Sequence, residues 1–211
     1  MDWRALRRWL LAGVAVVAVL GLAAELAHAY APTDLGEALL PKLSLSYEQN
    51  LPTWFSSSLL LLCAIAAGAI ASRPPPMRLH WWGMAVVAGW MSLDEAAEIH
   101  EHLAGHFNTH GVLYFDWVIP ATAIVIALAL VYVPFVRRLE SATRTRLIIA
   151  ATIYVGGALM MELPLGWITE SRGIENLAYA LVDWVEETME MIGAALAFVA
   201  LVAHRNSGVQ R

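Results

Sequence analysis

The sequence predicts an all-α fold, a polytopic membrane helical bundle with six transmembrane helices in a single domain covering residues 1–211. Composition is the first observation behind this prediction, because hydrophobic residues make up 59% of the chain, charged residues 15%, and mean hydropathy is +0.60. Soluble domains are about 45–50% apolar and about 25% charged. The second observation is that six mostly apolar segments approach the roughly 20 residues that a bilayer-spanning helix needs.

Short, punctuated connections separate the six segments. The run from Ser72 to Pro76 ends a helix, because prolines lack the backbone N–H and clash with the preceding turn. The longest connection, 30–52, contains three prolines, and we expect an outer surface segment with a short amphipathic piece. The predicted spans are 9–28, 54–72, 81–101, 114–135, 147–167 and 179–203.

Composition also excludes several classes of protein. The single cysteine, Cys63, rules out a disulfide scaffold and a cysteine-based zinc or iron–sulfur site. A net charge of −5 and a pI near 5.8 give no basic footprint for nucleic acid. We therefore expect the lipid bilayer, and no nucleic acid, as the chain's main environment.

Basic residues predict the orientation in the membrane. With a cytoplasmic N-terminus, all of the 13 Lys and Arg residues except Lys42 and Arg172 fall in cytoplasmic segments. Cytoplasmic loops carry such an excess of basic residues. The sequence therefore predicts a multi-pass protein of the bacterial inner membrane with both termini in the cytoplasm.

The first segment has a second interpretation. Three arginines precede its apolar stretch, which ends in the A-x-A pattern of Ala27-His28-Ala29, as in a cleavable secretory signal. The apolar stretch from Trp9 to Ala24 is long for a signal, so we favour a retained helix. The topology of the other segments is the same in both cases.

Acidic residues carry the functional signal. Counted at about 1.5 Å per residue from the cytoplasmic end of each helix, six carboxylates on four helices lie about 21–27 Å deep in a hydrocarbon core about 30 Å thick. No Lys or Arg shares this depth, and a carboxylate facing lipid is costly. We expect these side chains to face the bundle interior and hold shared protons, water or a metal: Glu25, Glu95, Glu98, Glu162, Glu187 and Glu190.

Two segments offer matching acidic motifs. The first reads DEAAEI from Asp94, and the second reads EETMEM from Glu186. Helical residues three or four apart share a face. The first motif therefore predicts a stripe of Glu95, Glu98 and His102 that His106 continues, and the second predicts a pair of Glu187 and Glu190.

This pattern resembles the site of ferritin-like di-iron and di-manganese proteins, in which two helices each give a Glu and two give Glu-x-x-His. Glu162 would be one single donor, and Glu25 or Glu48 the other. Neither motif here is Glu-x-x-His, so the resemblance concerns the site and not the whole chain. Carboxylates with one or two histidines suit hard or borderline cations, and the resemblance implies Fe or Mn.

Two further segments, LDEAAEIHE at 93–101 and NLPTWFSS at 50–57, resemble an uncharacterised group of bacterial multi-pass inner-membrane proteins, and no activity follows. Three functional hypotheses remain open. The first is a metal-dependent oxidoreductase of the di-iron type acting on a lipid-soluble substrate. The second is a divalent-cation or proton transporter that uses the same acids. The third is a non-catalytic subunit or assembly factor of a membrane complex, in which the acids form a structural network.

Overall fold

A computed structural model of the chain describes residues 2–100, 105 and 107–207, and every regular element within these ranges is helical. The predicted all-α class is confirmed. In chain order the elements are α1 (Trp3–Tyr30), α2 (Asp34–Leu43), α3 (Leu51–Ala71), α4 (Arg78–Ala97), η2 (Gly111–Leu113), α5 (Val118–Arg138), α6 (Ser141–Val155), η3 (Gly156–Met161), α7 (Glu162–Arg172) and α8 (Leu177–Ser207).

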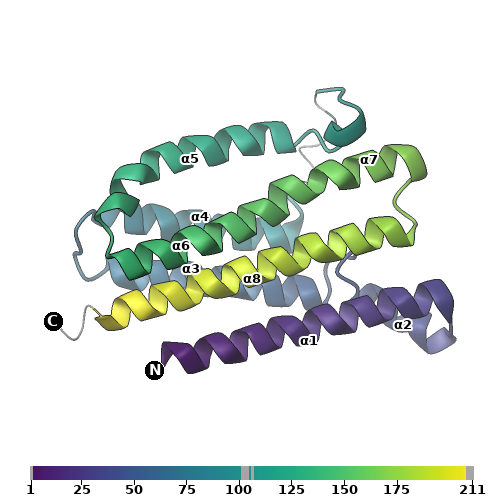
Figure 1. Ribbon diagram of the computed structural model, residues 1–211, viewed down its shortest axis with the longest axis horizontal. Helices are drawn as coiled ribbons and strands as arrows, with labels where there is room; N and C mark the ends of the chain where they lie inside the picture. Colours follow the sequence, from purple (N-terminus) through teal and green to yellow (C-terminus); the bar gives the residue numbers. More distant parts are fainter. Residues whose placement is uncertain (1, 101–104, 106, 208–211) are drawn as a thin grey trace.

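Four helices are long and apolar enough to cross a membrane. They are α1, α3, α5 and the continuous rod made of α6, the π-helix η3 and α7, which runs from Ser141 to Arg172. The long helices lie side by side, and both ends of the chain are at the same end of the bundle (Figure 1). Helix α2 is the short piece expected within the segment 30–52, and it turns back against α1.

Capping residues set helix ends that apolar length alone does not. Helix α3 begins at Leu51, three residues before the predicted start, because the Asn50 side chain accepts a hydrogen bond from the Thr53 amide at 3.1 Å. Pro52 fits this first turn, where its missing N–H has no partner to lose. The rod also begins earlier than predicted, at Ser141 and not at 147, although no side chain caps it there.

Helix α4 ends earlier than the predicted span 81–101, which is wrong at this end. Its last residue is Ala97, and Glu98 follows in the left-handed conformation with φ of 53°. The Asp94 carboxylate accepts a hydrogen bond from the His100 backbone amide at 2.9 Å, beyond the end of the helix. A side chain that captures a nearby backbone amide in this way competes with helix formation.

The start of α5 differs for a similar reason. The predicted span began at 114, but α5 begins at Val118. Asp116 is almost fully buried and accepts hydrogen bonds from the amides of Gly105 and Phe107, at 2.7 and 2.6 Å. Asp116 therefore organises the connection between α4 and α5 and delays the start of α5.

Helix packing relies on small and hydroxyl side chains, as is common between helices in a membrane. Ser57 of α3 and Ser92 of α4 donate hydrogen bonds to each other's backbone carbonyl at 2.7 and 2.8 Å. Helices α6 and α8 approach closely at Gly193, where an added Cβ would lie 2.7 Å from the Tyr154 backbone nitrogen. The absence of a side chain at Gly193 therefore permits this close approach.

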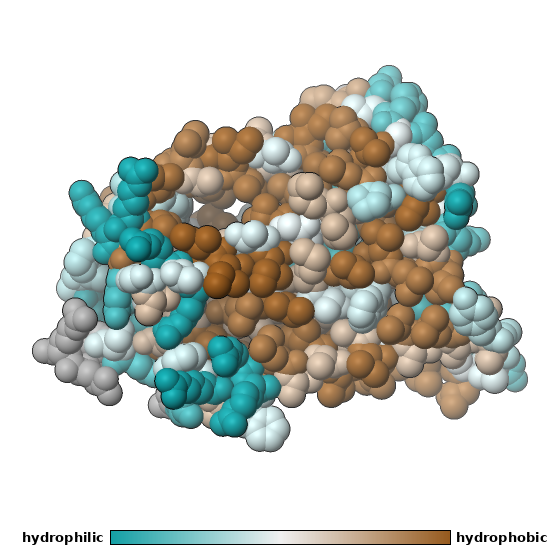
Figure 2. All heavy atoms as spheres, in the orientation of Figure 1, coloured by the Kyte–Doolittle hydropathy of each residue, from teal (hydrophilic) through white to brown (hydrophobic). Residues whose placement is uncertain are grey.

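Helix α5 is attached mainly near its two ends. At one end Phe135 is buried and the Tyr132 hydroxyl donates to the His80 carbonyl at 2.8 Å, and at the other end Val118 is buried. Between them Ile124 and Leu130 are 60% and 69% exposed. Figure 2 shows an opening in the surface at this place, between α5 and α6.

Candidate functional site

Five carboxylates from three helical segments form a group that we call the acidic cluster. Glu95 comes from the last turn of α4, Glu162 is the first residue of α7, and the others lie on α8. Glu186 is within electrostatic range of Glu162, Glu190 and Glu95, and Glu187 is within range of Glu95 and Glu190. We use the name for Glu95, Glu162, Glu186, Glu187 and Glu190, and Asp183 of α8 is also within range of Glu186 and Glu187.

Helix α8 contributes two buried carboxylates to the acidic cluster. Glu186 and Glu190 are four residues apart, share one helix face, and are only 6% and 7% exposed. The π-helix η3 packs directly on this face, because a Cβ added at Gly157 would lie 2.9 Å from the Glu186 carbonyl oxygen. π-helical turns are often found at functional sites. Here the turn immediately precedes Glu162.

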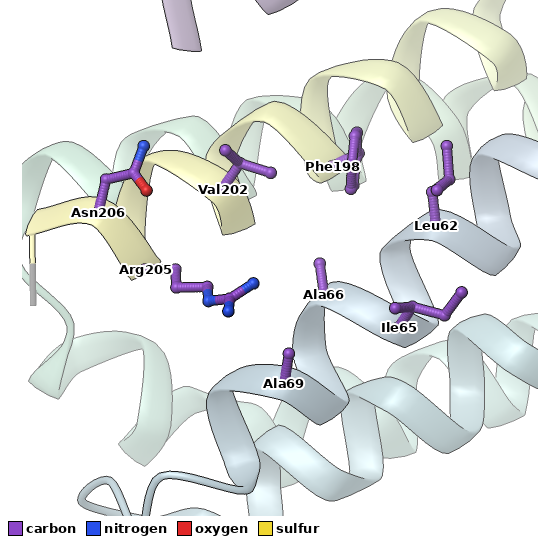
Figure 3. Close-up of a pocket in the computed structure, with 8 residues that line it drawn as sticks. All are labelled: Leu62, Ile65, Ala66, Ala69, Phe198, Val202, Arg205 and Asn206. Carbon is purple, nitrogen blue, oxygen red and sulfur yellow. The ribbon is translucent and has the colours of Figure 1, made fainter. Parts of the chain in front are cut away.

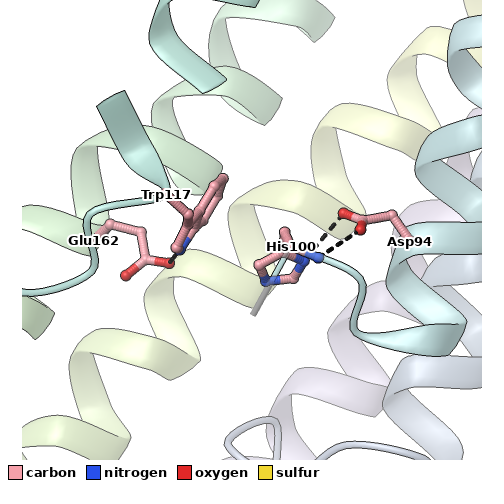
Figure 4. Close-up of polar contacts among 4 residues, drawn as sticks. All are labelled: Asp94, His100, Trp117 and Glu162. Atoms are coloured by element: carbon pink, nitrogen blue, oxygen red, sulfur yellow. Dashed lines mark hydrogen bonds and ion pairs between the residues drawn. The ribbon is translucent and has the colours of Figure 1, made fainter. Parts of the chain in front are cut away.

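A chain of polar and aromatic contacts joins α4 to α7 (Figure 4). The His100 ring lies 3.0 Å from the Asp94 carboxylate through Nδ1, and its centroid is 4.7 Å from that of Trp117. The Trp117 indole N–H then donates to Glu162 at 3.1 Å. These contacts fix the direction of Glu162 and place an imidazole within electrostatic range of Glu95 and Glu190.

Two hydroxyl groups face the acidic cluster from neighbouring helices. Tyr154 of α6 interacts with Glu190, and the fully buried Ser56 of α3 lies beside Glu95. Each hydroxyl can donate to a carboxylate or accept from a carboxylic acid. These two hydroxyl groups can therefore form hydrogen bonds with the cluster whether its carboxyl groups are ionised or protonated.

The acidic cluster has an excess of negative groups and few donors. Glu186 Oε2 is buried and has no hydrogen-bond partner among the described residues. The ion pairs within the described part of the chain all use a histidine as the cation, and none uses Lys or Arg. Neighbouring carboxylates without counter-charge cannot all be ionised. Among the described groups, only part of this negative charge can be balanced by the His100 imidazole, which is within range of Glu95 and Glu190.

The predicted stripe on α4 is not formed as expected. Because the helix ends at Ala97, Glu98 turns toward the loop before α3, where its carboxylate accepts a hydrogen bond from the Gln49 amide at 3.0 Å. The geometry of residues three apart on a continuous helix therefore does not apply to Glu95 and Glu98. The other predicted members of this stripe, His102 and His106, lie outside the described residues.

Two predicted single donors have partners elsewhere. Glu25 is buried on α1, where it accepts a hydrogen bond from the Ser44 hydroxyl. Glu48 is exposed before α3 and accepts from the Thr53 hydroxyl at 3.2 Å. Both acids therefore stabilise the connection between α1 and α3. Of the three acids predicted to be the one Glu that their helix contributes, Glu162 is the one that lies in the cluster.

Several neighbours of the cluster were not expected from the sequence. The contacts of His100 and Trp117 depend on turns that hydrophobic periodicity does not show. Tyr154 had a signal, since a phenol lies within an apolar span eight residues before Glu162. Glu186, which precedes the predicted pair of Glu187 and Glu190, is within electrostatic range of Glu162, Glu190 and Glu95.

The donor set can be compared with a metal site directly. Carboxylates with a nearby imidazole are ligands for Fe, Mn or another hard cation. Within residues 2–100, 105 and 107–207, however, no three His, Cys, Asp or Glu side chains are arranged as ligands of one ion. The described geometry brings the candidate ligands into electrostatic range and leaves them short of a closed coordination shell.

Fold and site together define an all-helical bundle with four candidate membrane spans and a buried acidic cluster. The chain belongs to the family described as a domain of unknown function, DUF8692, which matches residues 9–205. No curated protein and no solved structure matches the chain. The family therefore covers almost the whole bundle, including every member of the acidic cluster.

Proposed function

We propose that this chain is a multi-pass protein of the bacterial inner membrane with six crossings and both termini in the cytoplasm. Four of the six crossings are the apolar candidates α1, α3, α5 and the rod from Ser141 to Arg172. Helices α4 and α8 lie alongside them and carry the acids, and both pack against α3. The basic residues support the orientation, since eleven of the 13 fall in the segments predicted to be cytoplasmic.

We further propose that the acidic cluster binds a divalent transition metal, with Fe or Mn as the preferred ion. The observation that carries this proposal is the buried, unpartnered Oε2 of Glu186 among four other carboxylates, with no Lys or Arg ion pair in the described residues. A cation bound there would neutralise the cluster and satisfy this oxygen. Small shifts of the five side chains would be needed to close a coordination shell around it.

The activity that such a site would support is that of a di-iron-type oxidoreductase with a lipid-soluble substrate. The opening between α5 and α6 favours a substrate that arrives from the bilayer (Figure 2). Both helices carry exposed apolar side chains, among them Ile124 on α5 and Ile148 on α6.

Metal analysis of the detergent-purified protein tests the proposal. We expect one or two Fe or Mn ions per chain, and loss of most of this metal in a Glu186→Gln, Glu190→Gln double variant. The matched control is Glu175→Gln, which removes an exposed acid between α7 and α8. Absence of bound metal after growth with Fe and Mn, or equal metal in the double variant and the control, would refute metal binding.

A second candidate function is proton transfer or transport by the same acids. It is favoured by the lack of a three-ligand arrangement among the described residues, which suits shared protons better than an ion. Against a continuous path, the interior near the termini is filled by an apolar cluster that includes Cys63, Ala67, Trp81 and Phe135. Proton or cation flux into liposomes that disappears in Glu190→Gln, without bound metal, would support transport.

A further inference from the structure

A narrow groove lies between α3 and α8, near the end of the bundle that holds both termini (Figure 3). Its volume is about 290 Å³, below the roughly 300–1,000 Å³ of sites that enclose a drug-sized ligand. From Leu62 to Ala69 it extends along α3 for about 10 Å. Apolar side chains line both walls: Leu62, Ile65, Ala66 and Ala69 on α3, and Phe198 and Val202 on α8.

Two polar residues of α8, Arg205 and Asn206, complete the lining of the groove. Arg205, in the last turns of α8, extends its guanidinium across the groove toward α3 (Figure 3). In the described part of the chain no acid forms an ion pair with it. A basic residue at a helix C-terminus is favourable by itself. That effect does not explain why the guanidinium reaches over the apolar walls of a groove.

We propose that this groove binds one anionic phospholipid, with an acyl chain between α3 and α8 and the phosphate on Arg205. The length of about 10 Å fits part of one leaflet, since half of a hydrocarbon core is about 15 Å thick. A guanidinium binds phosphate oxygens through paired hydrogen bonds. Basic residues at the cytoplasmic face also attract the anionic lipids of that leaflet.

This binding site is separate from the acidic cluster and does not depend on it. The groove is formed by the parts of α3 and α8 near the termini, whereas Glu186 and Glu190 lie towards the other end of α8. Loss of the lipid should therefore leave metal content unchanged. The two proposals can fail independently.

Native mass spectrometry of delipidated protein, titrated with phosphatidylglycerol or phosphatidylcholine, tests the proposal. We expect one tightly held phosphatidylglycerol per chain and weaker binding of phosphatidylcholine. Arg205→Gln should weaken phosphatidylglycerol binding on the order of tenfold, the size expected for a hydrogen bond to a charged group, and Arg205→Lys should restore part of it. The matched control is Arg138→Gln, an exposed arginine at the same end of the bundle, which should bind like the wild type.

Filling the groove separates the chain from the headgroup. Ala69→Phe places a ring between the two walls and should reduce binding of both lipids. Metal content and elution from size-exclusion chromatography are measured on every variant, and if Ala69→Phe does not fold, the comparison of Arg205→Gln with Arg138→Gln decides. Equal lipid binding by these two arginine variants, or equal affinity for the two lipids, would overturn the proposal.

Discussion

The contact of α6 with α8 at Gly193 allows a stability prediction with an internal control. In Gly193→Ala the new Cβ would lie 2.7 Å from both the nitrogen and the Cβ of Tyr154, and 2.8 Å from its Cα. These atoms belong to the backbone or are fixed to it, so no rotamer change can relieve the overlap. Ordinary contact begins near 3.4 Å, so the helices must separate by at least about 0.7 Å.

The expected cost follows from this displacement. Overpacking of a tight contact costs about 1–3 kcal/mol, and a gap of 0.5–1 Å also loses a quarter to a half of the dispersion energy of the neighbouring contacts. Against this, alanine is better than glycine in a helix by about 1 kcal/mol. Gly89→Ala is the matched control, since its new Cβ would meet only Ala64 Cβ, at 3.8 Å. Both variants have the helix-propensity gain, so their difference measures the overlap.

Thermal or denaturant unfolding in detergent, followed by circular dichroism, measures this difference. We expect Gly193→Ala to be less stable than Gly89→Ala by about 1–3 kcal/mol, and Gly193→Val to be less stable still. Gly89→Ala should equal or exceed the wild type. If Gly193→Ala is as stable as Gly89→Ala, the two helices do not approach as closely as described, and the placement of Tyr154 beside the cluster is wrong as well.

Three other substitutions give further tests. Asp116→Asn keeps the size of the side chain but can accept only one of the two amide hydrogen bonds, so stability should fall by about 1–3 kcal/mol and hydrogen exchange of the preceding connection should accelerate. Tyr132→Phe removes the hydrogen bond to the His80 carbonyl and should cost about 1 kcal/mol, measured by thermal unfolding. Trp117→Phe keeps an aromatic side chain but removes the donor to Glu162, which should lower metal affinity by roughly 10–100-fold in a competition titration.

Apolar length and punctuation were sufficient to predict the helical class, because the bilayer requires long apolar helices and prolines interrupt them. The helix ends were less predictable. The start of α3 has a local signal in the sequence, because Asn50 is a favoured N-cap residue and Pro52 suits the first turn of a helix. The end of α4 had no such signal, because the run after Asp94 contains good helix formers, and only the contact of Asp94 with His100 shows where the helix stops.

Depth along a helix predicted much of the acidic cluster but not all of it. Depth gives only the position of a residue along the membrane normal, and Glu25, Glu98 and Glu95 lie at nearly the same depth. The structure adds the direction around each helix, which turns Glu25 to Ser44 and Glu98 to Gln49. It also brings Glu186, one position from the predicted Glu187, within electrostatic range of Glu162 and Glu95. Direction depends on helix packing, which a single sequence does not specify.

The π-helix η3 changes the direction in which side chains after it point, and an α-helical repeat does not predict this change. In an ideal α-helix, at about 100° per residue, Tyr154 and Glu162 would be separated by about 80° around the axis. One residue more in a turn, as in a π-helix, shifts the following residues back by roughly 100°, so the two differ by only about 20°. Both side chains can then face α8, where Tyr154 interacts with Glu190 and Glu162 with Glu186. Gly157 lets η3 lie against α8 at this point, so the irregular turn and the acidic cluster have one structural origin.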